Sequence, residues 1–380
     1  METVKGFRDY TGKEALKRAK IKKILIETFE KYGFFPAETP IIEYESFVKG
    51  NNQNDEVISD IFKLKDKGNR KLALRYEPTF QLKRISKDKR LPFRRYQIAE
   101  VFRDEPVSSN RFRQFTQCDV DIIGSNIRNE AEVLKAFSEI FDKLGIEIKI
   151  YINNRKLLNE ILDKEKIKNK EQIIREIDKL DKLSESEVKK NLKKYKADQL
   201  LKIFKNKKDF FKKYKEYEDI ESLMNYCKIF GIEVNFLPSL ARGLSYYNGS
   251  IFEIKTKGMK ETIAAGGSYL TNNIQSTGIS MGLERVSKIA KLSLEGIRAI
   301  IISINQEKEA IMLAENLRKN GVSCFILDKI SKALDYANKE FVPYVIFVGK
   351  EEVSKKKFKL RDMKKGKEKL LSLKQLANSL

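Results

Sequence analysis

FRDEPVSSNRFRQFTQCDVDIIG, residues 102–124, holds three arginines and four acidic residues in a strand–turn–strand pattern. Successive side chains of a strand point to opposite faces of a sheet. We therefore expect Val101, Arg103 and Glu105 to share one face of the first strand. The matching face of the second strand would carry Arg113, Phe115, Gln117, Asp119 and Asp121. The pattern predicts a polar, charged floor on one side of an antiparallel sheet.

Such a floor has two interpretations. Buried charges persist when they are paired or when a charged ligand completes them, so alternating arginines and carboxylates indicate a zwitterionic or phosphate-bearing ligand. A solvated sheet face with cross-strand ion pairs would show the same alternation. This segment alone leaves both interpretations open.

The chain contains no histidine, which excludes a Ser-His-Asp triad, histidine general-base catalysis and most zinc sites with nitrogen ligands. Its three cysteines are widely spaced and odd in number, which is typical of small core residues and not of a disulfide framework. Any chemistry must therefore use Arg, Glu, Asp, Tyr or Gln, with Mg²⁺ as a further option.

The net charge is +23, from 77 Lys and Arg against 54 Asp and Glu. Such a charge favours polyanionic partners such as nucleic acids, although a general bias toward lysine would produce it without any partner. The sequence has no run of eighteen apolar residues, and residues 1–10 lack the apolar core of a signal peptide. We therefore expect a cytoplasmic protein that does not cross a membrane.

The order of predicted elements indicates an α+β fold. Apolar spacing predicts a long amphipathic helix over 13–32 that ends at Gly33. Strands and helices without regular alternation follow, up to a strand at 147–152, and strand patterns return at 233–281. Residues 154–228 instead show lysine-rich helical stripes, and the basic surface of that module would either be solvated or contact RNA.

The last part of the chain has a different pattern. Strand, helix, strand, helix and strand follow one another over 298–348, which predicts a parallel α/β unit. The expected domains are an α+β domain in two parts, 1–153 and 231–292, an inserted helical domain at 154–230, and a C-terminal α/β domain at 296–380.

Three more segments accompany the charged hairpin: LRYEPT (74–79), LARGLSYY (240–247) and GISMGLER (278–285). Together they resemble the signature motifs of class II aminoacyl-tRNA synthetases, and RGLSYY is similar to a segment peculiar to the histidyl-tRNA synthetase family. KGFRDY (5–10), YGFFPAETPIIE (32–43), IREIDKLDKLSESEV (174–188) and DKISKALDYANK (328–339) follow the family's pattern in order. The resemblance implies an antiparallel class II catalytic domain with a helical insertion and a C-terminal anticodon-binding domain.

The resemblance also implies a reaction. Histidine would be activated by ATP to histidyl-adenylate and then transferred to the 3′ end of tRNA(His), with Mg²⁺ held by the ATP phosphates and no metal held by the protein itself. Charge that develops on the α-phosphate needs fixed cations. The family's positions make Arg103, Arg242 and Arg285 the expected catalytic residues. The expected ATP-binding residues are Arg103, Glu105, Arg111, Arg113 and Arg285.

The amino-acid pocket is also implied by the family's positions. Glu77, Thr79 and Gln117 would accept the ammonium group, and Asp121 with Tyr247 would hold the two imidazole nitrogens. Arg242 and Tyr246 complete the expected histidine-binding set. Gly266 and Gly267 would let the backbone approach the adenylate, or they would form a plain turn.

Some positions depart from the family's pattern. Ser245 stands where the family usually has aspartate, and Ser268 and Leu270 replace an arginine and an aspartate. These changes fit either the removal of a salt-bridge network or an altered pocket. The hairpin tip, residues 106–110, lacks a common Pro-Gln pair in a region that approaches the end of the tRNA, so how the 5′ guanosine is read stays open.

Two alternatives compete with the ligase hypothesis. One is a catalytically silent paralogue that resembles the regulatory subunit of ATP phosphoribosyltransferase, and the other is a tRNA-binding accessory protein. The C-terminal α/β pattern and the presence of Arg103, Arg242 and Arg285 together favour the ligase. The amphipathic helix that leads into Pro40 matches the family's dimer-forming segment, so we expect a homodimer.

Overall fold

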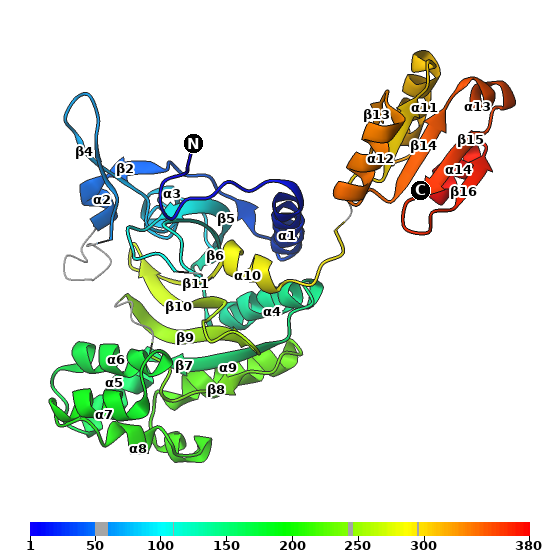
Figure 1. Ribbon diagram of the computed structural model, residues 1–380. Helices are drawn as coiled ribbons and strands as arrows, with labels where there is room; N and C mark the ends of the chain where they lie inside the picture. The colour runs from blue at the N-terminus through cyan, green and yellow to red at the C-terminus, as the bar shows by residue number, and fades with distance from the viewer. Residues whose placement is uncertain (50–59, 109, 242–245, 295) are drawn as a thin grey trace. The chain divides into compact units, whose positions relative to one another are not determined.

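A computed structural model describes residues 1–49, 60–108, 110–241, 246–294 and 296–380. The chain divides into two compact units, Met1–Leu292 and Ser293–Leu380. Each unit has its own sheet and its own apolar core (Figure 1). The predicted α+β fold with a separate C-terminal α/β domain is confirmed.

The first unit is built on an eight-stranded sheet in the order β1-β5-β6-β11-β10-β9-β7-β8. Its strands are β1 (Phe35–Pro36), β5 (Phe93–Phe102), β6 (Gln114–Ile123), β7 (Ile148–Asn154), β8 (Asn235–Phe236), β9 (Tyr247–Thr256), β10 (Ala264–Thr271) and β11 (Ile274–Gly282). The β1–β5 and β7–β8 pairs are parallel, and the other pairs are antiparallel. The long antiparallel strands in the centre give the site a rigid floor.

Strand β6 shows why this floor is polar. Cys118, Val120 and Ile122 are fully buried in the apolar core, so the alternation of side chains turns Asp119 and Asp121 to the opposite face. The predicted charged floor is therefore present, with a correction at its end. Arg103, Glu105 and Arg113 lie beyond the ends of β5 and β6, where the chain leaves the sheet.

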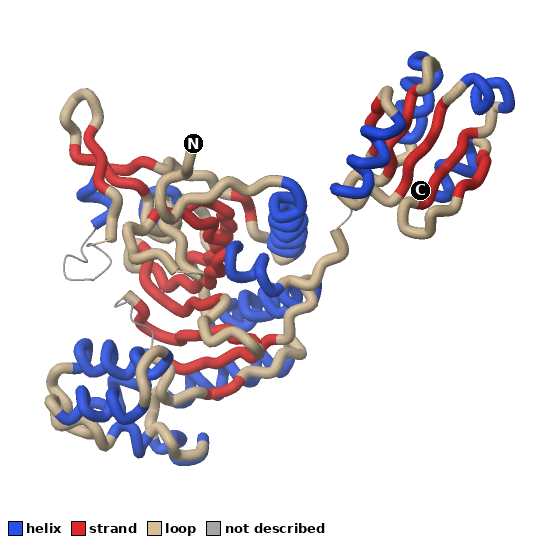
Figure 2. The backbone as a smooth tube through the Cα atoms, viewed as in Figure 1, coloured by secondary structure: helices blue, strands red, loops and turns tan. Residues whose placement is uncertain are grey.

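Helices cover the apolar face of the sheet. They are α1 (Gly12–Lys31), α4 (Ile127–Lys143), α9 (Tyr217–Ile229) and α10 (Leu283–Ile289). Phe29 of α1 packs against Phe137 of α4, with ring centroids 5.8 Å apart. The helix predicted at 13–32 is confirmed, and its apolar stripe faces the core. Figure 2 shows these helices beside the strands of the first unit.

A three-stranded antiparallel sheet, with strand order β2-β4-β3, was not predicted as a unit. It consists of β2 (Ile42–Tyr44), β3 (Lys63–Lys65) and β4 (Lys71–Leu74), with the short helices α2 (Glu45–Lys49) and α3 (Leu82–Ile85) nearby in the chain. The segment after β4 carries Tyr76, Glu77 and Thr79 into the site, because Arg75 is anchored by hydrogen bonds from Nε to Glu100 O (2.6 Å) and from Nη1 to Thr39 O (2.9 Å).

Short helices follow β7. They are α5 (Arg155–Lys164), α6 (Lys170–Asp178), α7 (Glu185–Lys193) and α8 (Leu200–Ile203), with 3-10 segments at Lys179–Asp181 and Lys208–Lys213. Phe211 and Tyr217 pack on Phe236 of β8, with ring centroids 5.1 and 5.2 Å apart. The helices form a cluster next to β7 in Figure 1, and their apolar residues belong to the core of the first unit. A separate insertion domain stays a proposal.

The C-terminal unit contains a five-stranded sheet in the order β13-β12-β14-β15-β16. Its elements are β12 (Ala299–Ser303), α11 (Glu307–Lys319), β13 (Cys324–Leu327), α12 (Ile330–Lys339), β14 (Tyr344–Val348), α13 (Lys350–Lys355), β15 (Phe358–Asp362), β16 (Glu368–Leu371) and α14 (Leu373–Ser379). The predicted parallel strands are confirmed. The antiparallel β15 and β16 were missed. Across the described residues of both units, every helix is too short or too polar to span a bilayer.

Candidate active site

One cavity of about 640 Å³ opens on the charged face of the large sheet. Its walls come from the segment after β4, the β5–β6 hairpin, strands β9, β10 and β11, and the start of α10. Residues of the predicted site that line it are Glu77, Thr79, Arg103, Glu105, Arg111, Gln117, Asp121, Tyr246, Tyr247 and Arg285. Segments far apart in the sequence therefore meet at one site.

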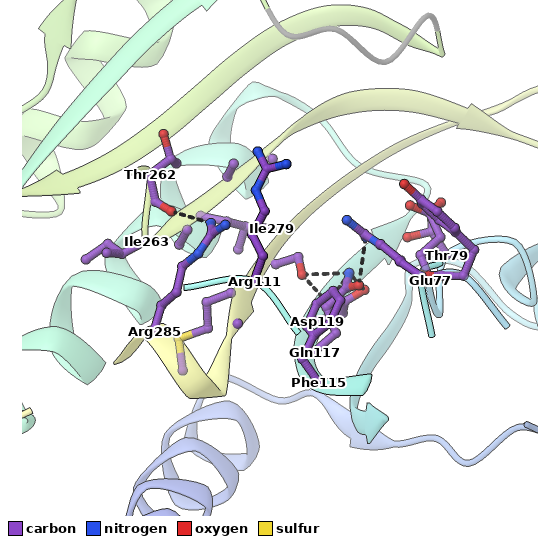
Figure 3. A pocket seen from close by; sticks show the side chains of 18 of the residues that line it. Glu77, Thr79, Arg111, Phe115, Gln117, Asp119, Thr262, Ile263, Ile279 and Arg285 are labelled. Atoms are coloured by element: carbon purple, nitrogen blue, oxygen red, sulfur yellow. Dashed lines mark hydrogen bonds between the residues drawn. The ribbon is translucent and has the colours of Figure 1, made fainter. Parts of the chain in front are cut away.

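Glu77 provides the acidic end of the cavity. Its side chain is 5% exposed, and within the described part of the chain its Oε1 has no hydrogen-bond partner. Burial raises the pKa of this carboxyl to about 7, against the attraction of Arg103. Figure 3 shows Glu77 beside Thr79, on the opposite side of the pocket from Arg285. A buried carboxylate with an unsatisfied oxygen is suited to accept a cationic donor.

Gln117 and Asp119 form a second polar group on the floor. The Gln117 amide donates to Asp119 Oδ1 (3.2 Å) and to Ser280 Oγ (2.9 Å). Burial raises the pKa of Asp119 to about 6, although Arg95 and hydrogen bonds from Ser280 and Gln117 oppose the rise. These bonds direct the Gln117 carbonyl toward Arg103, whose Nη2 donates to it at 3.3 Å.

Asp121 lies next to this group and is held from two sides. Arg95 Nη2 is 2.7 Å from Asp121 Oδ2, and the Tyr269 hydroxyl donates to Asp121 Oδ1. Burial raises the pKa of Asp121, and Arg95 lowers it. Asp121 was predicted to bind histidine, whereas neither Arg95 nor Tyr269 was predicted to take part in the site.

Arg103 lines the cavity, and its charge acts on both Glu77 and Arg285. Its guanidinium stacks over the Tyr76 ring, 4.2 Å from the centroid, and over the Phe115 ring at 5.0 Å. Its Nε also donates to Tyr76 O (3.4 Å). Cation–π stacking on two rings fixes the plane of the guanidinium and leaves donors for a ligand.

Arg285 and Arg111 provide the basic end. Arg285 Nη1 donates to Thr262 O (3.1 Å), and burial lowers the pKa of its guanidinium. Arg111 Nη1 is 3.6 Å from Glu105 Oε2. The two arginines lie together in Figure 3, away from Glu77 and Thr79. The cavity is therefore polarised: the carboxylates of Glu77, Asp119 and Asp121 lie near one another, and the guanidinium groups of Arg111 and Arg285 lie at the other end with the carboxylate of Glu105.

Glu284, the neighbour of Arg285, anchors the start of α10. Its Oε1 accepts from Arg18 Nη1 of α1 (2.9 Å) and from the backbone N–H of Thr116 in β6 (3.0 Å). Because α1, β6 and α10 meet at this buried carboxylate, the position of Arg285 depends on three elements. Sequence reasoning did not identify Glu284 or Arg18.

Arg113 and Arg242 differ from the other predicted residues. The Arg113 guanidinium pairs with Asp104 (Nη2–Oδ1 3.0 Å), and its side chain packs on Gly6, so it does not line the cavity. The backbone N–H of Arg113 donates to Gly6 O (3.0 Å), and this hydrogen bond connects the 5–10 segment to the β5–β6 hairpin. Arg242 lies outside the described residues, as does Ser245.

Two departures from the family's pattern can be placed. Ser268 is buried on β10 and donates through Oγ to Glu130 of α4, on the helical side of the sheet. Leu270 is exposed. Neither lines the cavity, so neither changes its wall. Gly266 does line it, and a Cβ there would come within 2.7 Å of Ile279 Cα, so close strand packing requires glycine at a position that lies in β10 and not in a turn.

Residues outside the predicted catalytic and binding sets complete the wall of the cavity. They include Tyr76, Phe115, Asp119, Thr262, Tyr269, Ser280 and Glu284, together with Arg175, Asp178, Lys179 and Lys182 of the helical cluster. Alternation along β6 already placed Asp119 on the charged face. The helical residues carried no signal of this kind, because their approach to the sheet depends on tertiary packing.

Comparison with known proteins gives a consistent result. The sequence profile of a family described as Histidyl-tRNA synthetase matches residues 6–286, and a profile described as Anticodon binding domain matches residues 298–380. Histidine--tRNA ligase 1 of a Bacillus cereus strain is 36% identical, with 100% of both chains aligned. Histidine--tRNA ligase of Clostridium tetani is 32% identical over 97% of this chain and 95% of that protein.

Solved structures show the same fold. The crystal structure of histidyl-tRNA synthetase from Nostoc sp. PCC 7120 superposes with a TM-score of 0.87, at 24% identity over 100% of this chain and 98% of that chain. An ATP phosphoribosyltransferase regulatory subunit/histidyl-tRNA synthetase from Bacillus halodurans gives a TM-score of 0.77, at 21% identity over 91% of this chain and 97% of that chain.

The antiparallel sheet, the motif-bearing cavity and the anticodon-binding unit are those of a class II aminoacyl-tRNA synthetase. The family match and the relatives above 30% identity narrow this further. The chain belongs to the histidyl-tRNA synthetase family.

Proposed function

We propose that this protein is a histidine–tRNA ligase that activates histidine with ATP and transfers it to the 3′ end of tRNA(His). The observation that carries the proposal is the polarity of one cavity. Glu77, whose Oε1 has no hydrogen-bond partner among the described residues, lies at one end, Arg285 lies at the other, and the charge of Arg103 acts on both. The ammonium group of an amino acid needs the carboxylate at one end, and the phosphates of a nucleoside triphosphate need the guanidinium groups.

Charges on the floor support an ammonium-binding end. Three buried carboxylates, Glu77, Asp119 and Asp121, line this part of the cavity. The cations that act on them are Arg95 and Arg103, so one negative charge is left over when all three ionise. A substrate ammonium would balance it, because buried charge is costly without a counter-ion.

Histidine bound at one end and ATP bound at the other would bring the reacting groups together. The histidine carboxylate attacks the α-phosphorus of ATP, the bond to the β-phosphate oxygen breaks, and pyrophosphate leaves with that electron pair. Arg103 would hold the carboxylate and the α-phosphate, and Arg285 with Arg111 would neutralise the leaving phosphates. Mg²⁺ would enter with ATP, with the phosphates as its ligands. Arg242 and Arg113 stay predictions for the same chemistry.

The tRNA would contact both units. The C-terminal unit matches an anticodon-binding domain, and Lys179 and Lys182 at the cavity edge are suited to phosphates near the 3′ end. The net charge of +23 agrees with a polyanionic partner. Because tRNA charging serves translation, we place the protein in the cytoplasm.

A homodimer is part of the proposal. Ile42, Tyr44 and Leu64 are 51%, 56% and 37% exposed, and the register of the β2-β4-β3 sheet puts them on one face. A contiguous exposed apolar face of this kind marks a protein interface. A second copy of this chain is the expected partner.

The test is amino-acid-dependent exchange of pyrophosphate into ATP, followed by transfer of labelled histidine to tRNA(His). We expect exchange with histidine and not with the other standard amino acids, and loss of exchange in Arg285→Ala with histidine binding retained. The matched control is Arg298→Ala, since Arg298 lies in the C-terminal unit.

A protein that exchanges pyrophosphate with none of the standard amino acids would contradict the proposal. The silent-paralogue alternative makes that prediction, with histidine binding preserved. The anticodon-binding match at residues 298–380 and the guanidinium end of the cavity favour the ligase.

A further inference from the structure

Arg95 is among the largest side chains that the protein buries almost completely, at 1% exposure. It lies on β5 directly opposite Asp121 of β6 in the strand register. Its Nη2 is 2.7 Å from Asp121 Oδ2, and its Nη1 donates to Gln97 Oε1 (3.2 Å). Arg95 itself does not line the cavity, whereas Asp121 does. Any effect of Arg95 on a ligand in the cavity must therefore be transmitted by the Asp121 carboxylate.

Asp121 is confined on its other sides as well. The Tyr269 hydroxyl donates to Asp121 Oδ1. On β11, Gly278 lies opposite Asp121, and a Cβ at this position would collide with the carboxylate and come within 2.8 Å of Val120 O. Three neighbouring strands thus fix the carboxylate, and its open side faces the cavity.

The charges around Asp121 explain why a cation is needed there. The titratable groups that face it are Arg95 on β5, Tyr269 on β10, Tyr247 on β9, Asp119 on its own strand and Glu77 after β4. Two of these groups, Asp119 and Glu77, are carboxyl groups, and when ionised their negative charge repels the Asp121 carboxylate. Burial raises the pKa of Asp121, and this rise is opposed first by the charge of Arg95 and second by the hydrogen bond from Tyr269. Without Arg95, the pKa of the Asp121 carboxyl would be higher still.

We propose that Arg95 is a positioning residue that keeps Asp121 ionised and aimed at the side chain of the bound amino acid. An ionised carboxylate accepts hydrogen bonds only, so it selects a side chain that offers an N–H, as imidazole does. A protonated Asp121 would compete as a donor. The inference rests on the proposed function, because it takes histidine as the ligand.

The experiment compares Arg95→Met with Arg94→Met and with the wild type. Arg94 is the matched control, since it lies on the other face of β5 and pairs with Glu132 (3.0 Å) away from the cavity. Histidine binding is measured by calorimetry, and KM and kcat by pyrophosphate exchange, from pH 6.5 to 9. Melting temperatures of all variants report the structural cost.

At pH 7 we expect Arg95→Met to raise KM for histidine about 10- to 100-fold, the loss typical of one hydrogen bond to a charged group, with a smaller change in kcat. The ratio to the wild type should shrink as the pH rises, because a higher pH favours the ionised form of the Asp121 carboxyl. Arg95→Lys should keep the wild-type pH profile, and Arg94→Met should leave KM unchanged.

A defect in Arg95→Met that does not vary with pH, or a KM equal to that of Arg94→Met, would overturn the inference. If Arg95→Met does not fold, the double variant Arg95→Met/Asp121→Asn removes the unpaired charge. Its KM should equal that of Asp121→Asn alone, and a further loss would contradict action through Asp121. If the wild-type protein shows no histidine-dependent exchange of pyrophosphate into ATP, the proposed function itself is contradicted. That outcome is distinct from a failure of the inference about Arg95.

Discussion

At the scale of single residues, Glu77 links stability to ligand binding. Its pKa rises from 4.5 to about 7 on burial, so the folded protein holds a proton that the unfolded chain releases between these values. The stabilising effect of that proton is complete below pH 4.5 and is lost as the pH rises through 7. Above pH 7 the buried anion costs about 3 kcal/mol.

Glu77→Gln should therefore separate stability from function. At pH 8 we expect a higher melting temperature than in the wild type, and at pH 5 the difference should nearly vanish. Histidine affinity at pH 8 should fall about 10- to 100-fold, because the amide lacks the charge that an ammonium needs. Scanning calorimetry and binding calorimetry measure the two effects.

The control for Glu77→Gln is Glu218→Gln, at an exposed position on α9. That variant should change neither property at any pH. A stability difference for Glu77→Gln that does not vary with pH, or unchanged histidine binding, would show that Glu77 carries no buried charge relevant to the ligand.

Predictions for single residues succeeded where the spacing along one strand determines which side chains share a face. Gln117 and Asp121 alternate on one strand, so their common face could be predicted from spacing. Arg95 could not be predicted in this way, because its partner is set by the register between β5 and β6. Arg113 was predicted to bind the triphosphate and stays a prediction; in the structure its guanidinium pairs with Asp104.

At the scale of elements, periodicity predicted the long helices and strands well. Helix α1 and strands β12, β13 and β14 lie within a few residues of the expected ranges. Strands β15 and β16 were missed because the segment is rich in lysine, and their pairing comes from the antiparallel hairpin and not from apolar alternation. The pairing of β2, β4 and β3 into one sheet was not predicted, because strands of three or four residues carry little alternation from which their partners could be inferred.

The β2-β4-β3 sheet carries the dimer prediction. Ile42→Asp would place a charge in the exposed apolar face, and we expect it to convert a dimer into a monomer because an unpaired charge is costly in an apolar interface. Light scattering at micromolar concentration measures the mass. Ile229→Asp is the matched control, since Ile229 is 79% exposed on α9 and lies on a different element.

A wild-type mass of one chain would contradict the dimer directly. Dissociation by both variants would point to a general loss of structure and not to this face. The amphipathic pattern of α1, from which the sequence predicted the dimer, faces the core of the first unit, so it does not itself supply the exposed surface.

At the scale of the whole molecule, the order of motifs was more informative than composition. The +23 charge alone could not distinguish a nucleic-acid partner from a lysine bias. Motifs that are separated by more than 200 residues, such as Glu77 and Arg285, line one cavity in the structure. Strands on both sides of the helical segment join one sheet, and this could be inferred because strand patterns stop before that segment and return after it.

The position of the helical cluster at the cavity edge could not be predicted from the sequence, although the helices themselves were. Lys179 and Lys182 lie on or next to a short 3-10 segment, and Lys255 of β9 fixes that segment through Asp181 (2.7 Å). Such an approach depends on packing between elements that are far apart in the chain. A lysine-rich helix by itself indicates only a solvated surface.

The most direct measurement is a crystal structure of the protein with histidine and a non-hydrolysable ATP analogue. The account predicts the ammonium within about 3 Å of Glu77, the imidazole N–H on Asp121, and phosphates at Arg103 and Arg285 in the same cavity. An amino acid bound away from Glu77 and Asp121, or a nucleotide that leaves Arg103 and Arg285 without contact, would contradict it.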